Sequence, residues 1–159
     1  YTATRFIPLP VFGLLSVGTL IFGITFTARD FVHKMGRPYV YGMIGAAAIL
    51  TSIMALFTDT PYRIILASFV TILIAETADT EVYQRFIQQP WLVRVSASNA
   101  VSVPLDSILF SMLAFFGTMP MIDIVAIIWA DIVWKWTTGL AFALLHYVGL
   151  KEAVPVAEV

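Results

Sequence analysis

Acidic and basic side chains lie inside long apolar segments of this chain, where they could bind a polar solute. Glu76, Asp79 and Tyr83 stand at i, i+3 and i+7, so a helix would place them on one face. Asp131 and Lys135 stand four residues apart with the acid first, the order that best supports an ion pair on a helix. Ionisable residues inside a membrane are costly and are by default functional, so the sequence predicts a binding site here.

A further polar group, Asn99, Ser102 and Asp106, has the same i, i+3 and i+7 spacing. Asp106 lies seven residues inside its apolar segment, and no basic residue stands within one turn of it. We therefore expect its partner to come from another helix, and Lys135 is the candidate. Trp134, together with Trp129, flanks Asp131, and spacing alone leaves open whether these rings face lipid or stack on a flat ligand.

The elements that must carry these residues are predicted to be membrane-spanning helices, since a bilayer core of about 30 Å needs about 20 apolar helical residues. Five spans are predicted in an all-α polytopic bundle, with 1–159 as a single transmembrane domain. They cover 6–28, 39–58, a segment that starts at 61 and continues without a helix breaker before 90, 98–117, and 120–149. At about 1.5 Å per residue, most of the acids fall at similar depths, which predicts a walled polar cavity between three helices.

Two alternatives involve no binding site: Asp131 and Lys135 only hold helices together, and Asp79 and Glu81 lie solvated at the level of the headgroups. Asn99 and Ser102 would then only cap a helix or bond between helices.

Composition excludes several other classes of protein. Hydrophobic residues make up 60% and charged residues 12% of the 159, against about 45–50% and about 25% in soluble domains. A net charge of −1 gives no basic surface for nucleic acid. The chain has no cysteine, its two histidines have no ligand spacing, and no Walker A pattern occurs. We expect no metal, no cofactor and no catalytic residue.

Orientation is predicted from the bias of basic residues toward the cytoplasm. One orientation puts most of them inside, namely Arg29, Lys34, Arg37, Arg85, Arg94 and Lys151, and leaves Arg5 and Arg63 outside. The expected location is the inner (plasma) membrane, with a multi-pass chain and a cytoplasmic C-terminus. The chain begins at Tyr1 without methionine, and an additional preceding helix would make six spans with both ends inside.

Several motifs resemble the queuosine precursor transporter family, a vitamin-uptake-transporter-like group, over most of the chain from about Gly13 to Gly149. They are Thr25-Phe26-Thr27-Ala28-Arg29-Asp30, Ala75-Glu76-Thr77-Ala78-Asp79-Thr80-Glu81-Val82-Tyr83, Ser98-Asn99-Ala100-Val101-Ser102, Asp106-Ser107-Ile108-Leu109-Phe110, Ala114-Phe115 and Lys135. The Asn…Ser…Asp-Ser…Phe pattern is the most specific of them. Residues 1–6 resemble the segment that follows the family's first span, so that span is expected before Tyr1.

The resemblance implies a membrane transporter, not an enzyme, that imports a 7-deazapurine such as preQ0 or preQ1 through a polar site between helices. The implied site residues are Glu76, Asp79, Tyr83, Asn99, Ser102, Asp106, Asp131, Trp134 and Lys135, with Arg29 and Asp30 in a gating or structural role. Its expected partners are the small-molecule substrate, the lipid bilayer, and an energising ATPase subunit or further copies of the chain.

Two other functions remain open. The family is similar to the substrate-binding subunits of energy-coupling-factor importers, so the chain could be such a subunit with a partner that hydrolyses ATP. Alternatively, Asp79 and Asp106 could form the acid/base pair of an intramembrane enzyme. A purely structural subunit would explain the ion pair but not the concentration of acids.

Overall fold

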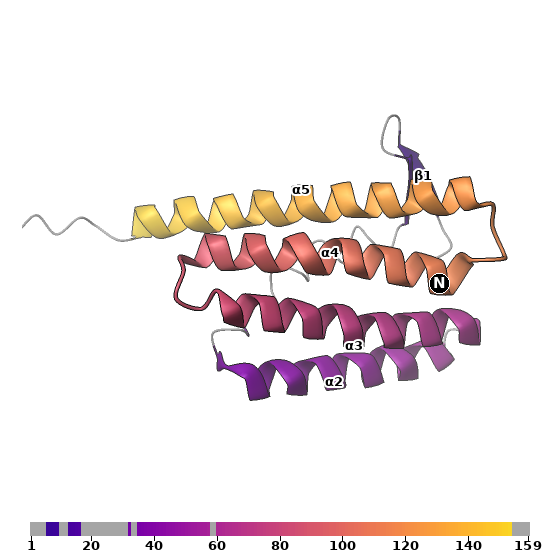
Figure 1. Cartoon of the computed structure of the whole chain (residues 1–159), viewed down its shortest axis with the longest axis horizontal. Coiled ribbons are helices and arrows are strands. Elements are labelled where there is room, and N and C mark those ends of the chain that lie inside the picture. Colours follow the sequence, from indigo (N-terminus) through magenta and orange to yellow (C-terminus); the bar gives the residue numbers. More distant parts are fainter. Residues whose placement is uncertain (1–5, 10–12, 17–31, 33–34, 58–59, 154–159) are drawn as a thin grey trace, which may run out of the picture.

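The computed structural model describes residues 6–9, 13–16, 32, 35–57 and 60–153. Its long helices are α2 (Arg37–Phe57), α3 (Tyr62–Arg85), α4 (Trp91–Phe115) and α5 (Met121–Ala153). They lie side by side in chain order, each packed against the next (Figure 1). The predicted helical class is confirmed for this part of the chain.

Proline sets where two of these helices begin. Pro61 and Pro90 stand immediately before α3 and α4, positions that proline tolerates because the first helical N–H groups have no partner in the helix. The predicted start of the fourth span near Ser98 is therefore too late, since α4 already begins at Trp91. After α4 the chain turns at Gly117, whose φ of +80° is a conformation that favours glycine.

The prediction of a first span over 6–28 is wrong where the structure describes that segment. Phe6–Leu9 (β1) and Gly13–Ser16 (β2) form an antiparallel pair with Pro8 opposite Leu14. Proline lacks the N–H that a helix interior needs, whereas a strand of a two-stranded ribbon accepts it. The rest of the predicted span, 10–12 and 17–28, lies outside the described residues. The strand β2 packs against α5.

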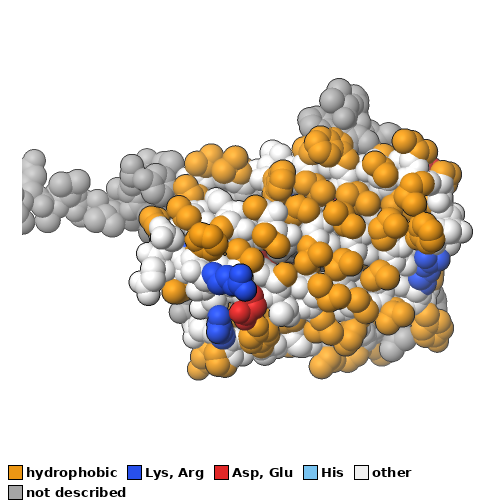
Figure 2. Space-filling model, viewed as in Figure 1, with side chains coloured by type: hydrophobic (Ala, Val, Ile, Leu, Met, Phe, Trp, Pro, Cys, Tyr) orange, Lys and Arg blue, Asp and Glu red, His pale blue; other side chains and the backbone are white. Residues whose placement is uncertain are grey.

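Two described helices are long and apolar enough to cross a membrane, Trp91–Phe115 with 25 residues and Met121–Ala141 with 21. The predicted count of five spans is not confirmed. Hydrophobic side chains cover most of one face of the molecule, and Lys and Arg side chains lie at its two ends (Figure 2). This distribution is the one expected for a bundle whose middle lies in hydrocarbon.

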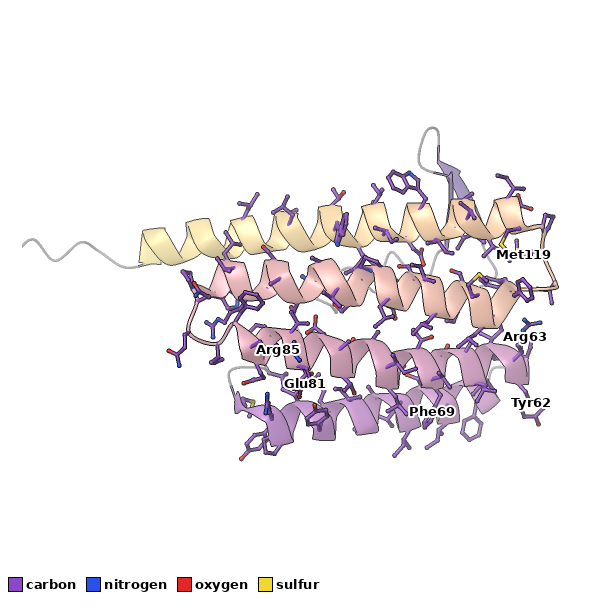
Figure 3. All side chains as sticks on the ribbon, in the orientation of Figure 1. Tyr62, Arg63, Phe69, Glu81, Arg85 and Met119 are labelled. Carbon is purple, nitrogen blue, oxygen red and sulfur yellow. The ribbon has the colours of Figure 1, made fainter. Side chains whose placement is uncertain are left out.

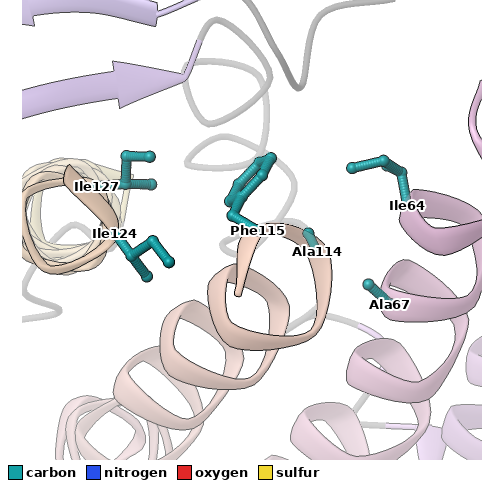
Figure 4. Packing of buried hydrophobic residues seen from close by; sticks show 6 residues of the cluster. All are labelled: Ile64, Ala67, Ala114, Phe115, Ile124 and Ile127. Atoms are coloured by element: carbon teal, nitrogen blue, oxygen red, sulfur yellow. The ribbon is translucent and has the colours of Figure 1, made fainter. Parts of the chain in front are cut away.

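The apolar core lies toward the end of the bundle at which α3 and α5 begin. It joins α3, α4 and α5 through Ile64, Ala67, Ala114, Phe115, Ile124 and Ile127 (Figure 4). The Phe115 ring also meets Phe110 edge to face, with 5.9 Å between ring centroids. This cluster fixes the spacing of the three helices that carry the predicted site residues.

Arg63 fastens the start of α3 to the end of α4. Its Nε donates to the Leu113 carbonyl at 2.7 Å, and its Nη2 donates to the Phe116 carbonyl. Carbonyls in the last turn of a helix have no partner within the helix, and they carry the negative end of its dipole. A guanidinium is well suited to this place because it donates to two of them at once. Arg63 lies at the end of the bundle opposite Arg85 and Glu81 (Figure 3).

We expect Arg63→Ala to lower the thermal unfolding temperature in detergent, since it removes two hydrogen bonds from a charged donor. The loss is about 1–3 kcal/mol, toward the lower end because Arg63 is exposed and water can replace it. The exposed Arg85 at the other end of α3 is the matched control, and Arg85→Ala should change the temperature far less. Equal shifts for the two variants would contradict the role given to Arg63.

Candidate functional site

The ammonium group of Lys135 is the centre of a buried polar cluster. Its Nζ donates to Asp106 Oδ2 at 2.6 Å and to Ser107 Oγ at 3.3 Å, both on α4. Asp131 Oδ2, one turn earlier on α5, lies 3.8 Å from the same nitrogen. The side chains of Lys135 and Asp106 are 5% and 18% exposed. The predicted partnership of Asp106 with Lys135 is confirmed, and two carboxylates share one ammonium.

A second contact extends the cluster to α3. The Ser102 hydroxyl donates to Asp79 Oδ1 at 2.7 Å, and neither residue has any exposed surface. Ser102 stands four residues before Asp106, so the two contacts lie in adjacent turns of α4. Side chains from three helices are thus joined by charge-assisted hydrogen bonds, which are stronger than neutral ones.

Other predicted residues of α3 lie beside this cluster in different settings. Glu76 is half-buried, and its backbone carbonyl accepts a 2.8 Å bond from the Thr80 hydroxyl. Tyr83 is fully buried, and the guanidinium carbon of Arg94 lies 5.2 Å from the centre of its ring. A cation over an aromatic face is attracted to it, so this contact ties α3 to α4 at the end opposite Arg63.

Of the remaining predicted residues, Asn99 and Trp134 lie in the described helices. Asn99 is half-buried on α4, and its backbone carbonyl accepts a bond from Trp136 Nε1. Trp134 is half-buried, and its Nε1 is buried without a hydrogen-bond partner in the described part of the chain. Such a donor usually has a partner, so a ligand acceptor would suit it. Arg29 and Asp30 lie outside the described residues.

Small residues on α4 allow the three helices to approach. Ser98, Ser102, Ser107 and Ser111 have no exposed surface, so α4 presents small side chains toward its neighbours. Pro104 lies within α4, where its ring nitrogen cannot donate to the carbonyl four residues earlier. The polar cluster therefore lies where α4 carries small side chains and lacks one backbone hydrogen bond.

A pocket of about 350 Å³ lies between α4 and α5 beside the cluster. It is lined by Val95, Ser96, Asn99, Ala100, Lys135, Trp136, Gly139 and Leu140. Of these eight residues, the sequence predicted Asn99 and Lys135 as site residues and did not predict the other six. It also did not predict the contact of Ser107 with Lys135. The available signal was the helical spacing of Ser96 with Asn99 and of Lys135 with Gly139, which puts each pair on one face.

A family model described as "Putative vitamin uptake transporter" matches residues 16–149. No curated protein and no solved structure matches the chain.

Breaking the ion pair from one side should be more damaging than removing both charges. Lys135→Met removes the ammonium group and leaves the Asp106 and Asp131 carboxylates without it. Removing one partner of a buried ion pair lowers the free energy of unfolding by about 3–5 kcal/mol. Asp106→Asn in the same chain removes one of those charges. We therefore expect the double variant to unfold at a higher temperature than Lys135→Met alone, measured in detergent. Additive losses in the double-mutant cycle would show that the two side chains are not coupled.

Proposed function

The chain belongs to the vitamin uptake transporter family, and from this premise we propose that it imports a 7-deazapurine precursor of queuosine, of the preQ0 or preQ1 type. A transporter of this family is a membrane protein, in keeping with the two apolar helices long enough to cross a bilayer. The observation that carries the proposal is the polar cluster of α3, α4 and α5, whose charged side chains are buried in an otherwise apolar bundle.

The chemistry of the ligand suits these side chains. A 7-deazaguanine is flat, and one edge presents N–H donors side by side, which a carboxylate accepts as a bidentate pair. Glu76, Asp79 and Asp106 are the candidate acceptors, while Asn99 and Ser102 can serve a carbonyl or a nitrile. Because Asp79 and Asp106 already accept bonds from Ser102 and Lys135, ligand binding would extend or exchange those bonds.

This arrangement favours binding over catalysis. Asp106 lies in an ion pair with Lys135, and Asp79 accepts a hydrogen bond from Ser102. Their contacts with other side chains of the cluster support the role of a recognition site better than that of an acid/base pair acting on a bond.

We expect labelled preQ0 to accumulate in cells that cannot make it when the chain is expressed, and Asp106→Asn to reduce this uptake. Loss of an ionic hydrogen bond of about 1.5–3 kcal/mol corresponds to a decrease of about tenfold or more. Asp123→Asn, the same change in the first turn of α5, is the control and should leave uptake unchanged. Normal uptake by Asp106→Asn at matched expression would remove Asp106 from the site.

The proposed orientation places the end of the bundle that holds Arg37, Arg85 and Arg94 in the cytoplasm of a plasma membrane. Arg37 begins α2, Arg85 ends α3 and Arg94 lies in the first turn of α4, so the three gather at one end. This distribution supports the orientation because cytoplasmic segments carry the excess of basic residues.

Single thiols test this orientation, because the chain has no cysteine of its own. In intact cells, an impermeant maleimide should label Thr118→Cys, between α4 and α5, and spare Gln88→Cys, between α3 and α4. Permeabilised cells supply the control, since both positions are exposed and both should then react. The opposite pattern in intact cells would reverse the proposed orientation.

An ATP-hydrolysing partner is proposed as the alternative source of energy, which would make the chain the binding subunit of an importer. The supporting observation is that the sequence has no Walker A pattern. Co-purification of an ATPase with the tagged chain would favour this alternative. Uptake by the purified chain alone in vesicles would favour an independent carrier.

A further inference from the structure

The pocket between α4 and α5 shares one residue with the buried polar cluster. Lys135 contributes to the pocket lining and also donates to Asp106. A molecule in this pocket would therefore contact Lys135, which is one member of the ion pair. Among the described residues that line the pocket, Lys135 is the charged one.

The size of the pocket limits what it can hold. Its volume of about 350 Å³ lies at the lower end of the range of about 300–1,000 Å³ in which small-molecule sites fall. The lining is apolar at Val95, Ala100 and Leu140, and polar at Ser96 and Asn99. A small ring system with a few polar atoms fits these surfaces.

Trp136 gives the pocket an aromatic wall. Its Nε1 donates to the Asn99 carbonyl at 3.3 Å, a bond that holds the indole of α5 across to α4. The Trp136 side chain is 46% exposed, and its indole offers a flat apolar face, which favours a planar guest. The Asn99 side-chain amide can donate a hydrogen bond to such a guest, and the Lys135 ammonium can do so by exchanging its 3.3 Å bond to Ser107.

We propose that this pocket holds the substrate, a small planar heterocycle whose acceptor atoms face Lys135 and Asn99 and whose ring lies along Trp136. This inference rests on the uptake function proposed above and adds Ser96, Trp136 and Gly139 as residues that determine specificity.

Gly139 offers a position from which a larger side chain can enter the pocket. A Cβ added at Gly139 would meet Asn99 Nδ2 at 3.9 Å, an ordinary van der Waals contact, so a larger side chain can start there and occupy the pocket. Gly42 on α2 is the matched control because a Cβ there meets nothing within 4 Å. Both glycines lie within helices, so the gain in helix propensity on replacement by leucine is similar.

The experiment measures binding of preQ0, preQ1 and guanine to the purified full chain by calorimetry. We expect Gly139→Leu to lower the affinity of the ligand that the wild type binds by about tenfold or more, and Gly42→Leu to leave it within about twofold of the wild type. Unchanged affinity in Gly139→Leu would show that the substrate does not bind in this pocket, and it would not contradict the proposed uptake function. If the wild type binds none of the three, the proposed substrate class fails and this inference fails with it.

A second measurement does not depend on how the leucine variant folds. Ala100→Cys places a single thiol in the pocket lining of a chain that has no other cysteine. The bound ligand should slow alkylation of this thiol by about fivefold or more at a ligand concentration well above Kd. Gly45→Cys on α2 should react at the same rate with and without ligand. Equal rates at Ala100→Cys with a ligand that calorimetry shows to bind would overturn the proposal.

Discussion

The ion pair between Lys135 and Asp106 is the interaction on which the rest of the site depends. Away from water the attraction between opposite charges grows, but so does the penalty for burying either charge alone. Lys135 is therefore stable at its place only while α4 and α5 keep the register that brings Asp106 to 2.6 Å and Ser107 to 3.3 Å. That register also creates the adjoining pocket, because Lys135 contributes to both. The packing of α4 on α5 and the proposed binding of the substrate thus depend on the same contact.

The surroundings of this contact explain why it can persist in a membrane protein. The buried serines of α4 are small enough to let three helices approach. Two of them contact charged groups, since Ser102 donates to Asp79 and Ser107 accepts from Lys135. The face shown in Figure 2 is largely hydrophobic, with basic side chains toward its two ends. A chain of this family needs both properties, since lipid must contact its outside while a polar solute is recognised within.

The sequence predicted the interior of the site better than its edges. The pairing of Asp106 with Lys135 followed from electrostatics, because an acid deep in an apolar segment needs a base from another helix. The start of α4 was placed too late, since the turn before Trp91 is set by Pro90 and not by the loss of apolar character. The first span was predicted from the length of an uncharged segment alone. Pro8 within that segment lies in a strand, opposite Leu14. The pocket was not predictable, because the meeting of Trp136 with Asn99 depends on how α5 is rotated against α4.

The most direct test of this account is an experimental structure of the chain with a bound 7-deazapurine. The account predicts density for a planar ligand between α4 and α5, in contact with Lys135 and next to Asp106. Density at another place on the chain, with these helices packed and their pocket empty, would contradict it.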